Sequence, residues 1–181
     1  MALSCVIAFV PNLSVDAFGA SETESTSFPN AVNGRASDVY VTQVGLHVLV
    51  TSPGNLWEAP ILKDDPEGGV LAIIDEDLFA ISVFGEGDRV RQVVEGTVQY
   101  EEGTPLSVES VFDEISDPEL SHLELIARLA GISSTELRKL DWYRLRPWPT
   151  KRNKLVKGTV YTITALVGFV VLNKVLPKIF A

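Results

Sequence analysis

All 24 aspartate and glutamate residues of this 181-residue chain lie before residue 144, and this one-sided distribution of charge constrains the fold more than any motif. Residues 1–143 contain only 7 lysine and arginine residues, so their formal net charge is −17. Residues 144–181 contain 8 basic residues and no acidic residue. Such a division predicts two parts in two environments, and the charge of the acidic part disfavours contact with nucleic acid phosphates.

The basic part contains an apolar segment. Sixteen residues without a charge, 158–173, lie between Lys157 and Lys174. This is shorter than the roughly 20 residues that a membrane-spanning helix needs, but lysine side chains at both ends can extend their ammonium groups towards the lipid headgroups. We therefore predict a transmembrane helix over residues 158–176 and a short tail over 177–181. A buried helix of a soluble domain and a helix lying in the membrane interface are the two alternatives.

Basic and aromatic residues precede the predicted helix, a mixture that is typical of a membrane–water interface. We predict that a basic collar, residues 144–157, contacts anionic lipid headgroups. The predicted membrane-interface residues are Trp142, Tyr143, Arg144, Arg146, Trp148, Lys151, Arg152, Lys154 and Lys157.

The same basic residues predict the orientation of the chain. Six of them precede the apolar segment and two follow it, so the positive-inside rule places the N-terminal domain in the cytoplasm. The layout is that of a tail-anchored, single-pass membrane protein. A face for packing against another helix is predicted from four small residues of the segment, Gly158, Thr162, Ala165 and Gly168.

The acidic part, residues 1–143, has the composition of a folded domain, since 46% of the chain is hydrophobic. Short runs of valine, isoleucine and phenylalanine, separated by acidic or glycine-containing turns, predict antiparallel strands. The predicted elements are a buried strand at 4–10, a short helix at 15–19, a surface loop at 21–37, a hairpin around Gly45, and three or four strands within 70–100. The predicted fold class is α+β, an antiparallel sheet with packed helices.

The hydrophobic pattern changes to a helical period after the strands. A helix is predicted with Pro118 in its first turn, Ser116 or Asp117 as its N-cap and Gly131 at its end. Its predicted apolar face consists of Leu120, Leu123, Ile126, Ala127 and Ala130.

Few side chains have the spacing that catalysis or metal binding requires. Asp75 and Asp77 occur at a predicted turn, where solvated carboxylates are more common than converging ligands. His47 and His122 lack a metal-ligand spacing, and Cys5, the single cysteine, is expected to be a small buried side chain. We predict no catalytic residue, no metal site and no cofactor. A hydrolase that uses Asp75, Asp77 or His47 is the enzymatic alternative.

Residues 126–140 resemble the helix-turn-helix motif of DNA-binding repressors. The core and turn positions of that family are matched by Ile126, Ala127, Ala130, Gly131, Ile132, Leu137 and Leu140. The resemblance implies a reading helix that begins at Ser133 and presents polar side chains to DNA. All the matches are packing positions, and the charge of the acidic part opposes phosphate contact.

Residues 79–143 resemble small bacterial α+β domains, some of which are similar to immunity proteins of toxin systems. This resemblance implies a binding role without catalysis. We predict that the acidic domain is a protein-interaction module or accessory subunit of a membrane complex, with a membrane protein or a basic protein as its partner and no nucleic acid. The first alternative is an immunity or inhibitor protein that binds a basic toxin, and the second is a membrane-tethered helix-turn-helix regulator.

Overall fold

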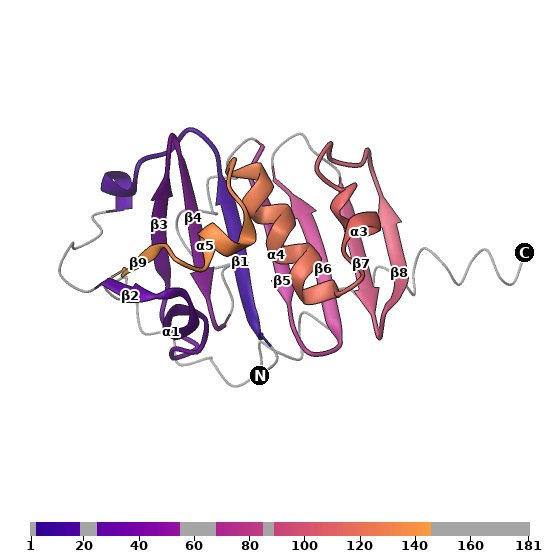
Figure 1. Ribbon diagram of the computed structural model, residues 1–181, viewed down its shortest axis with the longest axis horizontal. Coiled ribbons are helices and arrows are strands. Elements are labelled where there is room, and N and C mark those ends of the chain that lie inside the picture. The colour runs from indigo at the N-terminus through magenta and orange to yellow at the C-terminus, as the bar shows by residue number, and fades with distance from the viewer. Residues whose placement is uncertain (1–2, 19–24, 55–67, 85–88, 146–181) are drawn as a thin grey trace, which may run out of the picture. The chain divides into compact units, whose positions relative to one another are not determined.

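The computed structural model describes residues 3–18, 25–54, 68–84 and 89–145 (Figure 1). These residues belong to the unit Met1–Trp148 and form a nine-stranded antiparallel sheet with helices packed against it. The predicted α+β fold class is confirmed for this part of the chain. The predicted transmembrane helix 158–176 and the tail 177–181 lie outside the described residues. No helix within the described ranges is long and apolar enough to cross a membrane.

The strand β1 (Cys5–Val10) lies at the centre of the sheet, between β4 (His47–Ser52) and β5 (Val70–Ile74). Its side chains are buried on both faces, because Ile7 and Phe9 join one apolar cluster while Ala8 and Val10 join another. A strand covered on both faces is encoded as a nearly continuous apolar run rather than as an alternation. The predicted strand at 4–10 is confirmed.

The predicted hairpin around Gly45 is formed by β3 (Tyr40–Val44) and β4, which pair antiparallel. Gly45 has a φ of 57° in the turn between them, a value that glycine adopts without strain. On the other side of β1 the sheet continues through β5, β6 (Leu78–Val83), β7 (Val90–Val94) and β8 (Thr97–Glu102). These four antiparallel strands confirm the prediction for residues 70–100.

The main helix, α4 (Pro118–Leu129), packs across β1, β5 and β6 on one face of the sheet (Figure 1). Asp117 is its N-cap and accepts a hydrogen bond from the N–H of Leu120 at 3.1 Å. Leu123 and Ile126 are completely buried, as the helical period predicts, whereas Leu120 is 39% exposed. The face of α4 that packs on the sheet therefore includes the predicted apolar residues except Leu120.

The segment predicted as a surface loop, 21–37, instead contains a strand and a helix. These are β2 (Ser25–Ser27) and α1 (Phe28–Val32), and the side chains of Phe28, Ala31 and Val32 are buried. The polar sequence of β2 has no strand pattern of its own. It becomes a strand because it pairs with β9 (Asp141–Arg144), which is more than a hundred residues away in the chain.

The end of the acidic domain also differs from the prediction. The short helices α3 (Val111–Glu114) and α5 (Ser134–Leu137) flank α4, and β9 then returns to the sheet between β2 and β3. This strand extends one residue past the predicted domain end at 143. The helix expected to read DNA from Ser133 has a capping box with Glu136, but it is a single turn of 4 residues with Leu137 buried. That length does not match the reading helix of a helix-turn-helix motif.

Candidate interaction surface

Trp142, which the sequence predicted at the membrane interface, lies in the core of the described domain. Its side chain in β9 has no exposed surface, and its ring packs against Phe28 with 5.6 Å between ring centroids. Its Nε1–H has no hydrogen-bond partner among the described residues. An apolar packing role therefore explains this tryptophan better than the headgroup contact that its basic neighbours suggested.

Arg144 and Tyr143 are also held by the sheet. The guanidinium of Arg144 lies 2.5 Å from a carboxylate oxygen of Asp38, which is only 8% exposed, and so closes β9 onto the start of β3. Tyr143 is half-buried on the opposite face of β9 from Trp142. Both side chains therefore make contacts within the folded domain, independently of any contact with lipid.

The other predicted interface residues and the predicted helix-packing residues lie outside the described ranges. They are Arg146, Trp148, Lys151, Arg152, Lys154, Lys157, Gly158, Thr162, Ala165 and Gly168.

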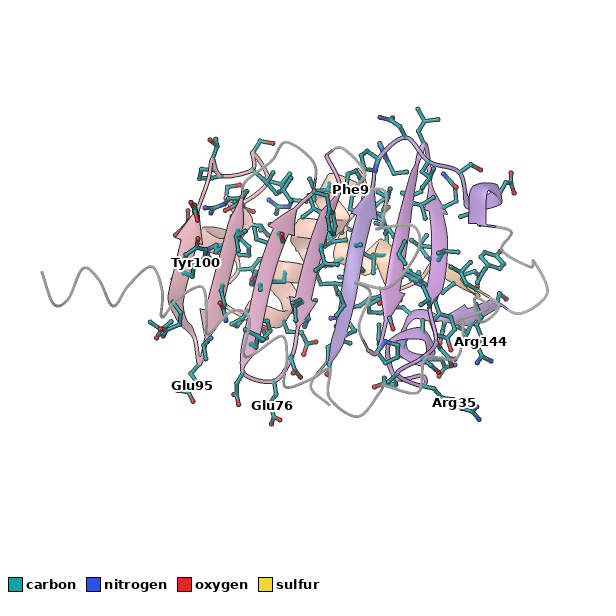
Figure 2. All side chains as sticks on the ribbon, turned by 180° about the vertical axis from the view of Figure 1, so that it is seen from behind. Phe9, Arg35, Glu76, Glu95, Tyr100 and Arg144 are labelled. Carbon is teal, nitrogen blue, oxygen red and sulfur yellow. The ribbon has the colours of Figure 1, made fainter. Side chains whose placement is uncertain are left out.

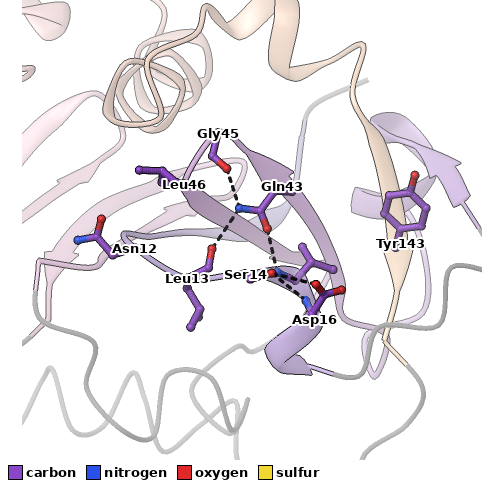
Figure 3. Close-up of a pocket in the computed structure, with 9 residues that line it drawn as sticks. Asn12, Leu13, Ser14, Asp16, Gln43, Gly45, Leu46 and Tyr143 are labelled. Carbon is purple, nitrogen blue, oxygen red and sulfur yellow. Dashed lines mark hydrogen bonds between the residues drawn. The ribbon is translucent and has the colours of Figure 1, made fainter.

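An open hollow of about 1000 Å³ lies where the chain after β1 meets the β3–β4 turn (Figure 3). Gln43 organises it: its amide nitrogen is 3.1 Å from the carbonyl oxygen of Leu13 and 3.0 Å from that of Gly45, and its amide oxygen accepts a 2.8 Å hydrogen bond from the N–H of Val15. These bonds join two turns of the protein itself. The polar groups of the hollow therefore hold the segment after β1 against the β3–β4 turn. Its described lining presents no pair of groups suited to acid–base chemistry.

The residues considered for a hydrolase do not meet. Asp75 and Asp77 are exposed in the β5–β6 turn, beyond the Cys5 end of β1, whereas His47 begins β4 at the Val10 end of β1. His47 packs on Phe9 with 5.0 Å between ring centroids. Within the described ranges there is no group of three or more histidine, cysteine or acidic side chains that could hold a metal ion.

His122 is a core residue of α4. Its Nδ1 lies 2.7 Å from the carbonyl oxygen of Pro118, which can only accept, so Nδ1 carries the proton. The ring packs between Phe79 and Phe112, and Nε2 has no hydrogen-bond partner in the described part of the chain. Burial is the main reason why the pKa of His122 is lowered to about 4; the hydrogen bond to Pro118 opposes this and the nearby charge of Arg91 supports it, so the ring is neutral near pH 7.

The burial of His122 predicts a loss of stability in mild acid. The pKa of about 4 in the folded state lies below the ordinary value of 6.5, so the unfolded chain binds more protons between these values. The contribution of neutral His122 to the free energy of unfolding is present in full well above pH 6.5. The free energy of unfolding is expected to fall by about 3 kcal/mol as the pH decreases to 4. Urea denaturation at a series of pH values measures this. His122→Leu should lose this part of the pH dependence and His47→Gln should keep it; an unchanged dependence in His122→Leu would contradict the assignment.

Exposed carboxylates gather on the β5–β8 side of the sheet. The N–H of Glu95 donates a 3.0 Å hydrogen bond to the carbonyl of Asp77, which brings the β5–β6 and β7–β8 turns together. Glu76 and Glu95 project from the same end of the sheet (Figure 2). We call the following six residues the acidic edge: Asp75, Glu76, Asp77, Glu95, Glu101 and Glu102.

Among the described residues from 68 to 102 only two are basic, Arg91 in β7 and Arg89 immediately before it. Arg89 is 3% exposed and donates to Glu109 at 2.9 Å and to Glu101 at 2.5 Å, so its charge is used internally. The hydrogen bond from Arg89 lowers the pKa of Glu101. The guanidinium of Arg91 lies 4.2 Å from the ring centroid of Phe112, on the helix-covered face. The acidic edge therefore keeps most of its negative charge facing solvent.

Sequence reasoning predicted the strand β8 but missed its position at the edge of the sheet and the role of Arg89. The available signal was an arginine immediately before the valine-rich strand β7, one of two basic residues between residues 68 and 102. Its partner Glu109 is 20 residues away, so the sequence alone did not reveal the pair.

Comparisons of the chain with protein-family models, with curated proteins and with solved structures give no significant match.

Proposed function

We propose that the protein is a non-enzymatic, single-pass membrane protein in which residues 158–176 form the anchor. Its acidic domain acts in the cytoplasm as a protein-interaction module or as an accessory subunit of a membrane complex. The observation that carries this proposal is the charge distribution: a net charge of −17 over residues 1–143, then a basic collar, then sixteen residues without a charge. Basic collars of this kind are retained on the cytoplasmic side and attract anionic lipid.

The structure of the domain supports an interaction role. The acidic edge is solvent-exposed, and acidic surfaces of this kind accelerate and orient the binding of basic partners. The predicted hydrolase residues lie at opposite ends of β1, which leaves binding as the better supported activity. The same surface also suits an inhibitor of a basic toxin, so this alternative stays open.

The position of the domain boundary allows the predicted anchor to be removed without removing any described strand. The last strand, β9, ends at Arg144; the N–H of Leu145 still donates a 2.9 Å hydrogen bond to the carbonyl of Val39, and the unit that contains both ends at Trp148. A chain truncated after Trp148 therefore keeps every described strand. We expect full-length protein to stay in the membrane pellet after alkaline carbonate extraction and the truncated chain to be soluble.

A second variant distinguishes insertion from surface adhesion. Leu166→Arg places a charge near the centre of the apolar segment, where insertion is disfavoured by about 2.5–3.5 kcal/mol, while the basic collar stays intact. It should reduce the carbonate-resistant fraction. Release of the full-length protein by carbonate would overturn the anchor. Recovery of a soluble basic toxin, and of no membrane subunit, from detergent extracts would favour the inhibitor role.

A further inference from the structure

The two edges of the sheet are protected very differently. At one edge β2 has 3 residues, and Pro29 follows it in α1. At the other edge β8 has 6 residues and is not shortened or interrupted by proline; it carries the negative charges of Glu101 and Glu102 and one irregularity in its pairing with β7, so it repels acidic strands more than basic ones. Natural edge strands are usually shortened, charged, bulged or covered, because their free N–H and C=O groups can pair with another chain. Within the described ranges no strand pairs with the outer side of β8.

The β7–β8 turn determines which backbone groups of β8 face outward. Val94 is opposite Thr97 across a two-residue turn in which Glu95 and Gly96 have φ values of 49° and 75°. In such a turn the N–H of Thr97 is directed at the carbonyl of Val94. Antiparallel ladders alternate between bonded and non-bonded pairs, so the next pair, Val93 and Val98, directs its backbone groups away from each other. The N–H and C=O of Val98 therefore point out of the sheet edge.

The side chains of β8 offer contacts on both faces. Val98 is opposite Val93, which is buried beneath the helices, and Tyr100 is opposite Gln92, the neighbour of Val93. Val93 and Gln92 are neighbours in β7 and face opposite sides of the sheet. Their partners Val98 and Tyr100 therefore also face opposite sides, because the irregularity leaves Gln99 as an extra residue between them. Val98 is 44% exposed. A strand added here would find an apolar contact on one face and an aromatic contact on the other.

We propose that the outer edge of β8 binds an extended, basic segment of a partner protein as an additional strand of the sheet. This proposal rests on the proposed interaction function and specifies its partner. The backbone of β8 supplies the hydrogen bonds. Glu102 at the end of β8 and Glu95 in the turn before it are exposed carboxylates, and Glu101, which pairs with Arg89, is also exposed. Lysine or arginine side chains of an incoming strand complement these carboxylates, since opposite charges on neighbouring strands attract.

Charge also argues against a second copy of this chain as the occupant. Two β8 strands paired edge to edge would bring the acidic edges of two molecules together. Like charges across neighbouring strands disfavour pairing. A basic segment removes that repulsion.

Val98→Pro tests the proposal directly. Proline removes the N–H that points outward and leaves the bonded positions of the β7–β8 ladder untouched. Val98→Ala is the matched control, because it also shortens the side chain but keeps the N–H. The probe is a short peptide of alternating lysine and valine, titrated against the full chain in non-ionic detergent. A second peptide with N-methylated backbone amides lacks the hydrogen bonds. Circular dichroism verifies that both variants are folded.

We expect the native chain and Val98→Ala to bind the unmodified peptide equally, and Val98→Pro to bind it about tenfold more weakly or worse. The N-methylated peptide should lose binding to every variant. Salt-sensitive binding that is unaffected by Val98→Pro and by N-methylation of the peptide would overturn strand addition. It would still agree with an acidic interaction module. Absence of any salt-sensitive binding would contradict both. Self-association of the full chain that Val98→Pro abolishes would assign the edge to a second copy and overturn the basic partner.

Discussion

Replacing Arg89 with methionine is expected to lower the free energy of unfolding by about 3–5 kcal/mol. The Arg89 guanidinium is almost completely buried and contacts both carboxylate oxygens of Glu109, a carboxylate of Glu101 and the carbonyl of Glu102. Glu109 is itself 9% exposed and also accepts a 2.8 Å hydrogen bond from the N–H of Leu106. Without Arg89 the Glu109 carboxylate stays buried with no positive charge beside it. The free-energy cost of this unpaired buried charge is larger than that of replacing both members of the ion pair by apolar residues.

Urea denaturation followed by circular dichroism measures this effect, and Arg91→Met is the matched control. Arg91 is two residues further along the chain, in β7, but it is partly exposed and stacks on Phe112, so we expect a loss of about 0.5–1 kcal/mol. The double variant Arg89→Met with Glu109→Leu should recover much of the lost stability, because apolar pairs replace buried ion pairs at little cost. Equal losses in Arg89→Met and Arg91→Met would show that the buried pair has no special role.

Replacing Trp142 with alanine is expected to lower the free energy of unfolding by about 3–5 kcal/mol, as for other fully buried tryptophan residues. Trp142 lies in β9, which joins β2 to β3, and its ring packs on Phe28 of α1. The substitution therefore removes the contact between the last strand and the segment that follows β2. We expect the loss to appear in chemical denaturation at pH 7.

Tyr143→Ala is the control for Trp142, because Tyr143 is the next residue of β9 and is only half-buried. It should cost clearly less stability. The two substitutions also separate the core role from the membrane-interface role that the neighbouring basic residues suggested. If Trp142→Ala weakened membrane association and left unfolding unchanged, the core assignment would fail.

The elements that could be predicted from the sequence are those made by contacts within a short window. The strand 4–10, the β3–β4 hairpin at Gly45, the strands from β5 to β8 and the capped helix α4 all have local signals: an apolar run, a turn glycine, or Asp117 followed by Pro118. Each signal involves residues that are close together in the chain. Their physical causes therefore operate whatever the rest of the fold does.

The elements that could not be predicted depend on distant partners. β2 is a run of serine and threonine, and β9 has only 4 residues; each is a strand because the other lies beside it. The same holds for the candidate site. The acidic composition was evident, but the pairing of Arg89 with Glu109 and the open edge of β8 depend on the order of strands in the sheet.

The sequence by itself determined the division of the chain into an acidic domain and a basic, apolar end, because charge and hydropathy are properties of residues and do not depend on the fold. It also determined the antiparallel hairpins and the position of α4. Only the tertiary structure decided that Trp142 belongs to the core and that Arg89 is buried with Glu109. It also decided which strand edge is open. Burial and edge position arise from which distant segments pair, and that choice is made by the packing of the whole sheet.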